Sequence, residues 1–219
     1  MAFENHGAYP FPLENQKFFF GGHNVHVLVP AAGPVHAAYK GGKIAFPYWS
    51  QVWPSALALS TFLVNHTTLI EGKSVLELGA GLGLPSLLAA QYAALVFCSD
   101  YEPLAVALIE ESAKLNQLVN LQALQLDWRQ LPEEMQTDVL LLSDVNYEAS
   151  FFPQLYALLQ RFLNAGTIIV LATPQRLAAK PLIERLEQDR ILDEELVIPF
   201  QGASVVVSVL VLKRDAEAN

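Results

Sequence analysis

The sequence is poor in cysteine and in long apolar runs. Cys98 is the only cysteine among the 219 residues, so no disulfide can form within the chain. No apolar stretch approaches the roughly 20 residues that cross a bilayer. The first residues also lack the basic start and apolar run of a secretory signal. We therefore expect a cytoplasmic protein with no membrane partner.

Basic residues are also few. Lysine and arginine number 13 against 22 aspartates and glutamates, which gives a net charge of −9. This balance argues against a nucleic acid as the main partner, because a polyanion is bound by basic side chains. It is compatible with a cationic substrate, such as a lysine side chain of another protein. Solubility alone would explain the same charge.

Several signatures of catalysis are missing. The chain has no cysteine pair, no G-x-S-x-G elbow and no P-loop lysine, which disfavours thiol, serine-hydrolase and kinase chemistry. His23 and His26 are three residues apart in an alternating segment, so they should face opposite sides of a strand. We expect no metal site.

The length and the 53% hydrophobic content predict one globular domain with a large core. Residues 1–50 contain short alternating runs and are predicted to form a small β-rich N-terminal extension. Residues 51–219 are predicted to form the main domain. Its first element is a helix that starts near Pro54, a residue that suits a first helical turn, and runs to about Asn65.

From residue 74 onward, short apolar runs alternate with helical patterns. Such runs are typical of parallel strands that are covered on both faces. The expected strands are 74–78, 95–99, 121–126, 138–143 and 167–172, and the expected helices are 84–92, 103–116, 151–163 and 178–188. Two final strands, 192–199 and 203–213, have only a Gln-Gly turn between them and should form an antiparallel hairpin. The predicted fold is α/β, a Rossmann-like, doubly wound, mostly parallel sheet of seven strands.

Glycines 79, 81 and 83 separate the first of these strands from its helix. This layout brings backbone close to a nucleotide-like ligand. A dinucleotide fingerprint would need glycine at position 84, where Leu84 stands instead. We place Glu77 in the turn, where its carboxylate would repel a pyrophosphate and attract a sulfonium. The turn therefore favours S-adenosylmethionine over NAD, and an ordinary β–α turn is the alternative.

Two further strands of the predicted sheet end in acidic residues. Asp100 follows the glycine turn by about 20 residues, where a carboxylate can bind ribose hydroxyls. Alternatively, it caps the helix that begins near Pro103. Asp127 could accept a hydrogen bond from an adenine amino group, with Trp128 flat against the base. The alternative is a turn aspartate beside a half-buried tryptophan.

A carboxylate and a phenol follow the strand at 138–143. Asp144 and Tyr147 could face one pocket and hold a target amine. Alternatively, Asp144 caps the helix near residue 151 and Tyr147 packs locally.

Three large aromatic residues, Tyr48, Trp49 and Trp53, precede the first strand of the sheet. They could close over a cofactor or attract a cation through their ring faces. They could equally fill core space.

These motifs resemble the seven-β-strand protein-lysine methyltransferases, family 16 of the S-adenosylmethionine-dependent methyltransferases. That family includes the calmodulin-lysine and electron-transfer-flavoprotein-lysine enzymes. The resemblance covers roughly residues 45–185. It is based on the aromatic segment 47–54, the glycine turn with its strand, Asp100, residues 126–128 and the D-x-x-Y motif from Asp144 to Tyr147.

The resemblance implies a methyltransferase that uses S-adenosylmethionine, releases S-adenosylhomocysteine and acts on a protein lysine. It implies that Asp144 and Tyr147 are the catalytic residues at the lysine entrance. We expect the cofactor to be bound by Trp53, Glu77, Gly79, Ala80, Gly81, Gly83, Asp100, Tyr101, Asp127, Trp128 and Ser143. Two alternatives remain, a small-molecule amine as the methyl acceptor and a non-catalytic cofactor-binding scaffold.

Overall fold

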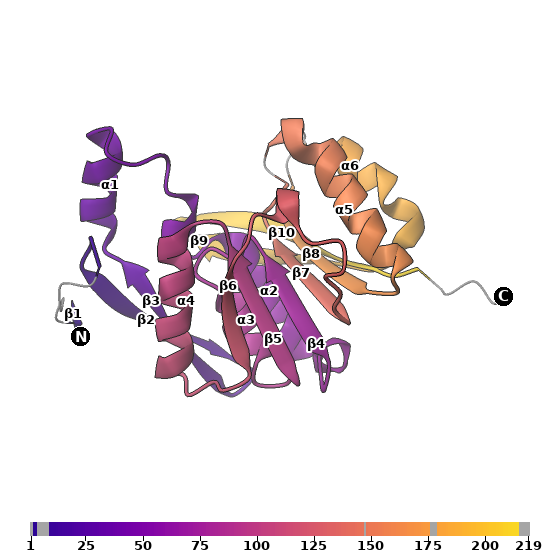
Figure 1. Cartoon of the computed structure of the whole chain (residues 1–219), viewed down its shortest axis with the longest axis horizontal. Helices are drawn as coiled ribbons and strands as arrows, with labels where there is room; N and C mark the ends of the chain where they lie inside the picture. Colours follow the sequence, from indigo (N-terminus) through magenta and orange to yellow (C-terminus); the bar gives the residue numbers. More distant parts are fainter. Residues whose placement is uncertain (1, 4–8, 147, 176–178, 215–219) are drawn as a thin grey trace.

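The computed structural model describes residues 2–3, 9–146, 148–175 and 179–214 (Figure 1). Its main sheet has seven strands in the order β6-β5-β4-β7-β8-β10-β9. The strands are β4 (Ser74–Leu78), β5 (Leu95–Asp100), β6 (Leu121–Gln125), β7 (Val139–Ser143), β8 (Ile168–Pro174), β9 (Arg190–Phe200) and β10 (Ala203–Leu212). Strands β4 to β8 pair in parallel, and β10 pairs antiparallel with both β8 and β9. The predicted fold and its C-terminal hairpin are confirmed.

Helices cover both faces of this sheet (Figure 1). They are α2 (Pro54–Asn65), α3 (Leu84–Ala89), α4 (Pro103–Leu115), α5 (Phe152–Asn164) and α6 (Lys180–Arg185). Alternate side chains of a strand point to opposite faces. Val75 of β4 accordingly packs in one apolar cluster with α2, and its neighbour Leu76 packs in another with α5 and α6. Within the described ranges, no helix has the length and apolar character needed to cross a membrane.

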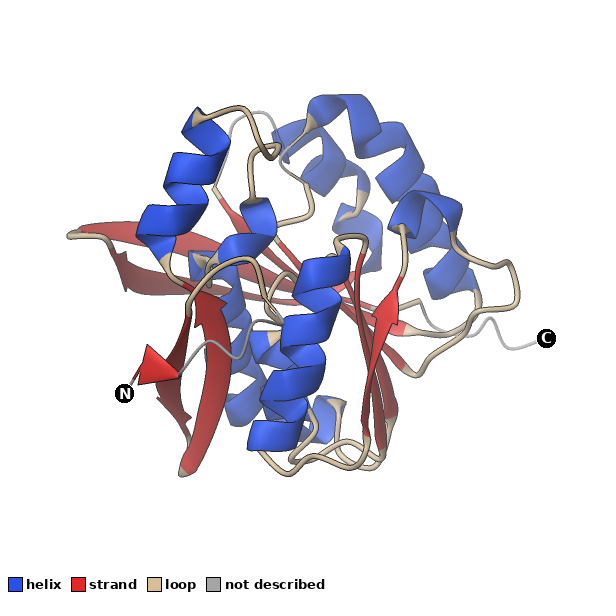
Figure 2. Cartoon of the chain, turned by 60° about the vertical axis from the view of Figure 1, so that its left-hand side comes forward, coloured by secondary structure: helices blue, strands red, loops and turns tan. Residues whose placement is uncertain are grey.

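The N-terminal segment forms a second, smaller sheet of β1 (Ala2–Phe3), β2 (Leu13–Phe20) and β3 (His23–Pro30). It lies against α3 and α4 as a third layer (Figure 2). Side chains at the end of α4 cover the outer edge of β3. The His26 N–H donates to Asn116 Oδ1 at 2.9 Å, and the Leu28 N–H donates to Ser112 Oγ at 3.0 Å. These bonds occupy backbone N–H groups of an edge strand that could otherwise pair with another chain.

Three elements differ from the prediction, and one of them is α3, which ends at Ala89 and not near residue 92. The N-terminal extension, predicted to be β-rich, contains a helix, α1 (Ala32–Lys40), in addition to its strands. Val35 is the only residue of α1 that is buried, so the helix has almost no apolar stripe by which the sequence could reveal it. The helix expected at 178–188 is also shorter, since α6 ends at Arg185 and a 3₁₀ turn follows at Glu187–Asp189.

The connection from β4 to α3 depends on a missing side chain. Gly83 has φ +71° and precedes α3 directly. A Cβ atom at this position would lie 2.8 Å from Cys98 Sγ and 3.1 Å from Ile109 Cγ1. Only glycine therefore lets α3 begin so close to β5 and α4.

We predict that Gly83→Ala lowers the free energy of unfolding by about 2–5 kcal/mol. The left-handed conformation costs an alanine about 1–2 kcal/mol, and overpacking of a filled core adds about 1–3 kcal/mol. Gly202→Ala is the matched control, because Gly202 has φ +79° and nothing lies within 4 Å of the point that a Cβ would occupy. Gly202→Ala should lose only the part of the free energy of unfolding that comes from the left-handed conformation. Equal losses for the two variants in urea unfolding would contradict the packing argument.

Candidate functional site

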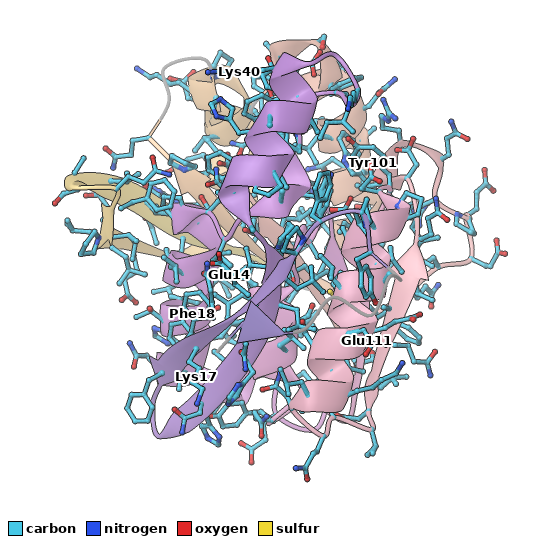
Figure 3. The ribbon with its side chains drawn as sticks, turned by 90° about the vertical axis from the view of Figure 1, so that its left-hand side faces the viewer. Glu14, Lys17, Phe18, Lys40, Tyr101 and Glu111 are labelled. Atoms are coloured by element: carbon cyan, nitrogen blue, oxygen red, sulfur yellow. The ribbon has the colours of Figure 1, made fainter. Side chains whose placement is uncertain are left out.

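A cavity lies over the carboxyl ends of β4, β5 and β7, where the strand order reverses. Ligands of doubly wound sheets bind at this position. The cavity is lined by Tyr48, Trp49, Gln51, Val52, Trp53, Ala56, Gly79, Ala80, Gly81, Leu82, Gly83, Leu84, Asp100, Tyr101, Trp128, Ser143, Asp144 and Val145. Tyr101 is labelled in Figure 3, where it lies near the start of α4.

Most of the predicted site residues meet in this cavity. Those that line it are Trp53, Gly79, Ala80, Gly81, Gly83, Asp100, Tyr101, Trp128, Ser143 and Asp144. Glu77 and Asp127 are absent from the lining. The predicted catalytic Tyr147 lies outside the described residues.

The glycine turn is held by hydrogen bonds within itself and to the neighbouring strand β5. The Ala80 N–H donates to the Ser99 carbonyl at 2.9 Å, and the Gly83 N–H donates back to the Ala80 carbonyl at 2.9 Å. The Gly81 N–H donates to Asp100 Oδ2 at 2.8 Å. The turn thus forms one wall of the cavity and is tied to the end of β5.

The position of Glu77 differs from the prediction, which placed its carboxylate in the turn. Glu77 lies within β4, with its side chain fully buried, and does not point into the cavity. Its Oε2 accepts hydrogen bonds from the Ser86 N–H at 3.0 Å and from Ser86 Oγ at 2.5 Å. Residue 77 falls on the α2–α3 side of the sheet because it alternates with Leu76 and Leu78. Its carboxyl group therefore joins β4 to α3.

Burial raises the pKa of the Glu77 carboxyl from 4.5 to about 8, because a charge is poorly solvated there. The two hydrogen bonds from Ser86 lower the pKa, and the nearby Asp100 charge raises it slightly further. Glu77 is therefore neutral at neutral pH.

Asp100 is positioned as the sequence predicts, at the end of β5 and on the cavity wall. Only 4% of the residue is exposed. Oδ2 accepts from Gly81, and Oδ1 accepts from the Glu102 N–H at 3.0 Å. Burial raises the pKa of Asp100, and these backbone hydrogen bonds oppose the rise. The bond to Glu102 organises the turn before α4 rather than capping the helix itself, whose N-cap is Glu102.

The side chains of Asp127 and Trp128 have different surroundings in the structure. The Asp127 carboxylate forms a bidentate pair with the Arg129 guanidinium, at 2.8 Å from Nε to Oδ1 and 2.6 Å from Nη2 to Oδ2. This pairing lowers the pKa of Asp127. Trp128 lines the cavity, and its ring meets Phe151 edge-on at 6.2 Å. The structure shows Trp128 at the site, whereas a cofactor contact by Asp127 remains a prediction.

The aromatic segment covers the glycine turn. The indole N–H of Trp53 donates to the Tyr48 carbonyl at 2.6 Å, which folds the segment back on itself. The Trp53 ring also lies 6.2 Å from that of Phe200 in the C-terminal hairpin. Trp49 is buried and lines the cavity, and its backbone lies 3.7 Å from where a Cβ of Gly81 would be. Core packing and cavity formation are thus combined in the same segment.

Asp144 follows β7 and has φ +57°, in the left-handed region. Its N–H donates to the Ala172 carbonyl of β8 at 2.9 Å and so continues the ladder between β7 and β8. This places Asp144 on the cavity wall.

Sequence reasoning missed several apolar lining residues. They are Val52, Ala56, Leu82, Leu84 and Val145, together with the polar Gln51. Only their positions beside recognised motifs could have identified them, because apolar residues are common throughout this chain.

The cavity lining is acidic. Its charged members among the described residues are Asp100 and Asp144, with neither lysine nor arginine. Such a lining favours a cationic guest. In the part of the chain that the structure describes, no three His, Cys, Asp or Glu side chains group as metal ligands would.

We predict that Glu77 makes stability fall as pH rises. Below pH 4.5 the Glu77 carboxyl is protonated in both the folded and the unfolded state. Between 4.5 and about 8, only the folded state keeps this proton, so unfolding becomes easier by up to about 1.4 kcal/mol per pH unit. Glu77→Gln removes this titration and retains an acceptor for Ser86, so its profile should be flatter. Urea unfolding from pH 4 to 9, with exposed Glu71→Gln as the control, checks this; a Glu77→Gln slope equal to wild type contradicts it.

The proteins similar to this chain in sequence include two kinds of methyltransferase. Human histone-arginine methyltransferase METTL23 is 35% identical over 112 residues, which are 48% of this chain and 59% of that protein. The mouse electron transfer flavoprotein beta subunit lysine methyltransferase is 31% identical over 132 residues, 59% of this chain and 51% of that protein. The chain thus spans about half the length of these relatives.

Solved structures support the fold. The T. thermophilus 16S rRNA N2 G1207 methyltransferase RsmC, in complex with AdoMet and guanosine, has a TM-score of 0.63 at 20% identity. That match covers 92% of this chain and 51% of RsmC. The structure of SMU.776 complexed with SAH has a TM-score of 0.63 at 15% identity, covering 90% and 56% of the two chains.

The family assignment rests on a longer match than either relative gives. Residues 48–189 match a family described as lysine methyltransferase. This range includes the three aromatic residues at 48, 49 and 53, the glycines of the turn, Asp100, Trp128 and Asp144, all of which line the cavity. The chain belongs to the lysine methyltransferase family.

Proposed function

We propose that this protein transfers a methyl group from S-adenosylmethionine to a lysine side chain of another protein. The observation that carries the proposal is the acidic, aromatic cavity at the strand-order reversal of a member of this family. Gly81, Asp100, Trp128 and Ser143 are suited to an adenosine-like ligand, since they offer close backbone, a carboxylate, a flat ring and a hydroxyl. When bound, the cofactor supplies an electrophilic methyl group on its sulfonium and departs as S-adenosylhomocysteine.

The protein's own task is to position the acceptor. The nitrogen lone pair forms the new N–C bond, the S–C electron pair stays with sulfur, and the amine loses a proton. Good alignment of two reactants lowers a barrier by about 7–11 kcal/mol. A lysine ammonium has a pKa of about 10.4. Apolar cavity walls favour its neutral form, whereas Asp144 favours the charged form. We therefore assign Asp144 to binding and orienting the amine, with its proton released to water or to a neighbouring group.

An arginine side chain is a second candidate acceptor, because METTL23 is named a histone-arginine methyltransferase. A guanidinium carries the same positive charge as an ammonium and would suit the same acidic cavity. A small-molecule amine would be a third kind of acceptor, and a non-catalytic scaffold would transfer no methyl group at all. Cytoplasmic location, and the lack of nucleic-acid, membrane and metal partners, stay predictions from the sequence.

The function is tested by mass spectrometry of cell lysates incubated with the protein and isotope-labelled cofactor. We expect labelled methyl groups on protein lysines with wild type and none with Asp144→Ala. Both proteins should bind S-adenosylhomocysteine in calorimetry with similar affinity. Asp193→Asn, in the edge strand β9 and outside the cavity lining, is the control and should methylate normally. Label on arginine or on a metabolite would replace the proposed acceptor, and no binding at millimolar ligand would favour a scaffold.

The rim of the cavity supports a macromolecular acceptor. Three exposed rings continue outward from it, with centroids 5.3 Å apart for Tyr39 and Phe46 and 4.5 Å apart for Phe46 and Tyr48. Tyr48 also lines the cavity. Aromatic residues are enriched at protein interfaces, where they contribute a large part of the binding energy.

We predict that Phe46→Ala lowers kcat/KM for a protein acceptor by about five- to tenfold, the loss of an interface contact worth about 1–1.4 kcal/mol. Cofactor binding should be unchanged, because Phe46 does not line the cavity. Phe19→Ala is the matched control, since Phe19 is 69% exposed on β2 and lies outside this rim. A small-molecule acceptor predicts equal kcat/KM values for both variants and wild type.

A further inference from the structure

Asp144 has an unusual backbone conformation for its place in the fold. Three described residues other than glycine have positive φ, Gln117, Asp144 and Gln201. Gln117 lies just after helix α4, and Gln201 lies in the turn between β9 and β10, where such angles are common. Asp144 instead follows a buried parallel strand and lines the cavity. A left-handed conformation is unfavourable for a residue with a Cβ, so the surroundings must hold it.

Two hydrogen bonds to β8 contribute to this restraint. The first joins the Asp144 N–H to the Ala172 carbonyl at 2.9 Å. The second joins side chains, since Asn146 Nδ2 donates to Thr173 Oγ1 at 2.9 Å. The Thr173 hydroxyl in turn donates to the Pro174 carbonyl at 3.1 Å, which orients its lone pairs toward Asn146. The two residues on either side of Val145 are therefore fixed to successive residues of one strand.

The Asn146–Thr173 pair is almost completely buried. Asn146 is 1% exposed and Thr173 is 4% exposed. Asn146 Oδ1 has no hydrogen-bond partner among the described residues, so this side chain is only half satisfied. An apolar pair of the same shape would pack there without that penalty. The polar pair is therefore not the best choice for stability alone. What it provides, and an apolar pair would lack, is a directional hydrogen bond.

We infer that Asn146 and Thr173 are positioning residues that hold Asp144 in its left-handed conformation at the cavity wall. The inference rests on the proposed function in one respect, the role of Asp144 in orienting the acceptor. Neither residue lines the cavity, so both act through Asp144 and not on the substrate.

Thr173→Val is the sharpest variant, because it keeps the branched shape and removes the hydroxyl. We expect kcat for lysine methylation to fall about tenfold, as the loss of one ordinary hydrogen bond in the orienting structure would give. The dissociation constant of S-adenosylhomocysteine should change by less than about twofold. Thr173→Ser restores the hydroxyl and should recover at least about half of the wild-type kcat. Asn146→Ala should match Thr173→Val, and the double variant should lose no more than either single one.

Thr167→Val is the matched control. Thr167 is also a buried threonine, 2% exposed, and its hydroxyl donates to the Thr137 carbonyl at 2.7 Å next to the opposite end of β8. It should lose stability and keep kcat. The inference is overturned if Thr173→Val keeps the wild-type kcat, or if kcat falls equally in Thr167→Val. Should Asn146→Ala not fold, the two Thr173 variants still decide the question.

Hydrogen exchange separates this inference from the proposed function. In Thr173→Val, the Asp144 amide should exchange at least about tenfold faster than in wild type, with β7 amides unchanged and Thr173→Ser like wild type. This readout needs no activity. A wild-type protein without methyl transfer but with this exchange pattern refutes the proposed function alone. Unchanged exchange at Asp144 in an active protein refutes the positioning role alone.

Discussion

The close approach of Gly83 to Cys98 is the contact on which the site depends. Because residue 83 has no side chain, α3 starts directly against β5 and α4, and the preceding turn folds over the end of β5. That fold brings the Gly81 N–H to the Asp100 carboxylate. A larger residue at 83 would push α3 outward and move the turn away from Asp100, so the cavity wall follows from this packing.

Three acidic residues of similar expected function have three different environments. Glu77 is buried and neutral, and it fastens α3 to β4 through Ser86. Asp100 is buried at the cavity wall with two backbone donors. Asp127 is partly exposed and neutralised by Arg129. Of the three, only Asp100 lines the cavity, which makes it the best placed to bind a ligand.

A strained residue lies where the proposed chemistry takes place. The cavity wall contains glycines with left-handed conformations and, in addition, Asp144, for which that conformation is unfavourable. The strand β8 behind it supplies two restraints, through Ala172 and Thr173. A rigid sheet is a better support for such a residue than a loop, because its own hydrogen bonds fix the two acceptors.

The sequence by itself determined the seven strands, the final hairpin and the place of the glycine turn. Buried parallel strands must be continuous apolar runs, and turns of this kind need glycine, so both leave a local signal. Tertiary structure alone decided that Glu77 faces α3, that Asp127 pairs with Arg129 and that α1 forms on one buried residue. It also decided that Asn146 reaches Thr173, 27 residues further along the chain. These contacts depend on which face a side chain occupies and on what the chain brings opposite it, and local sequence contains neither.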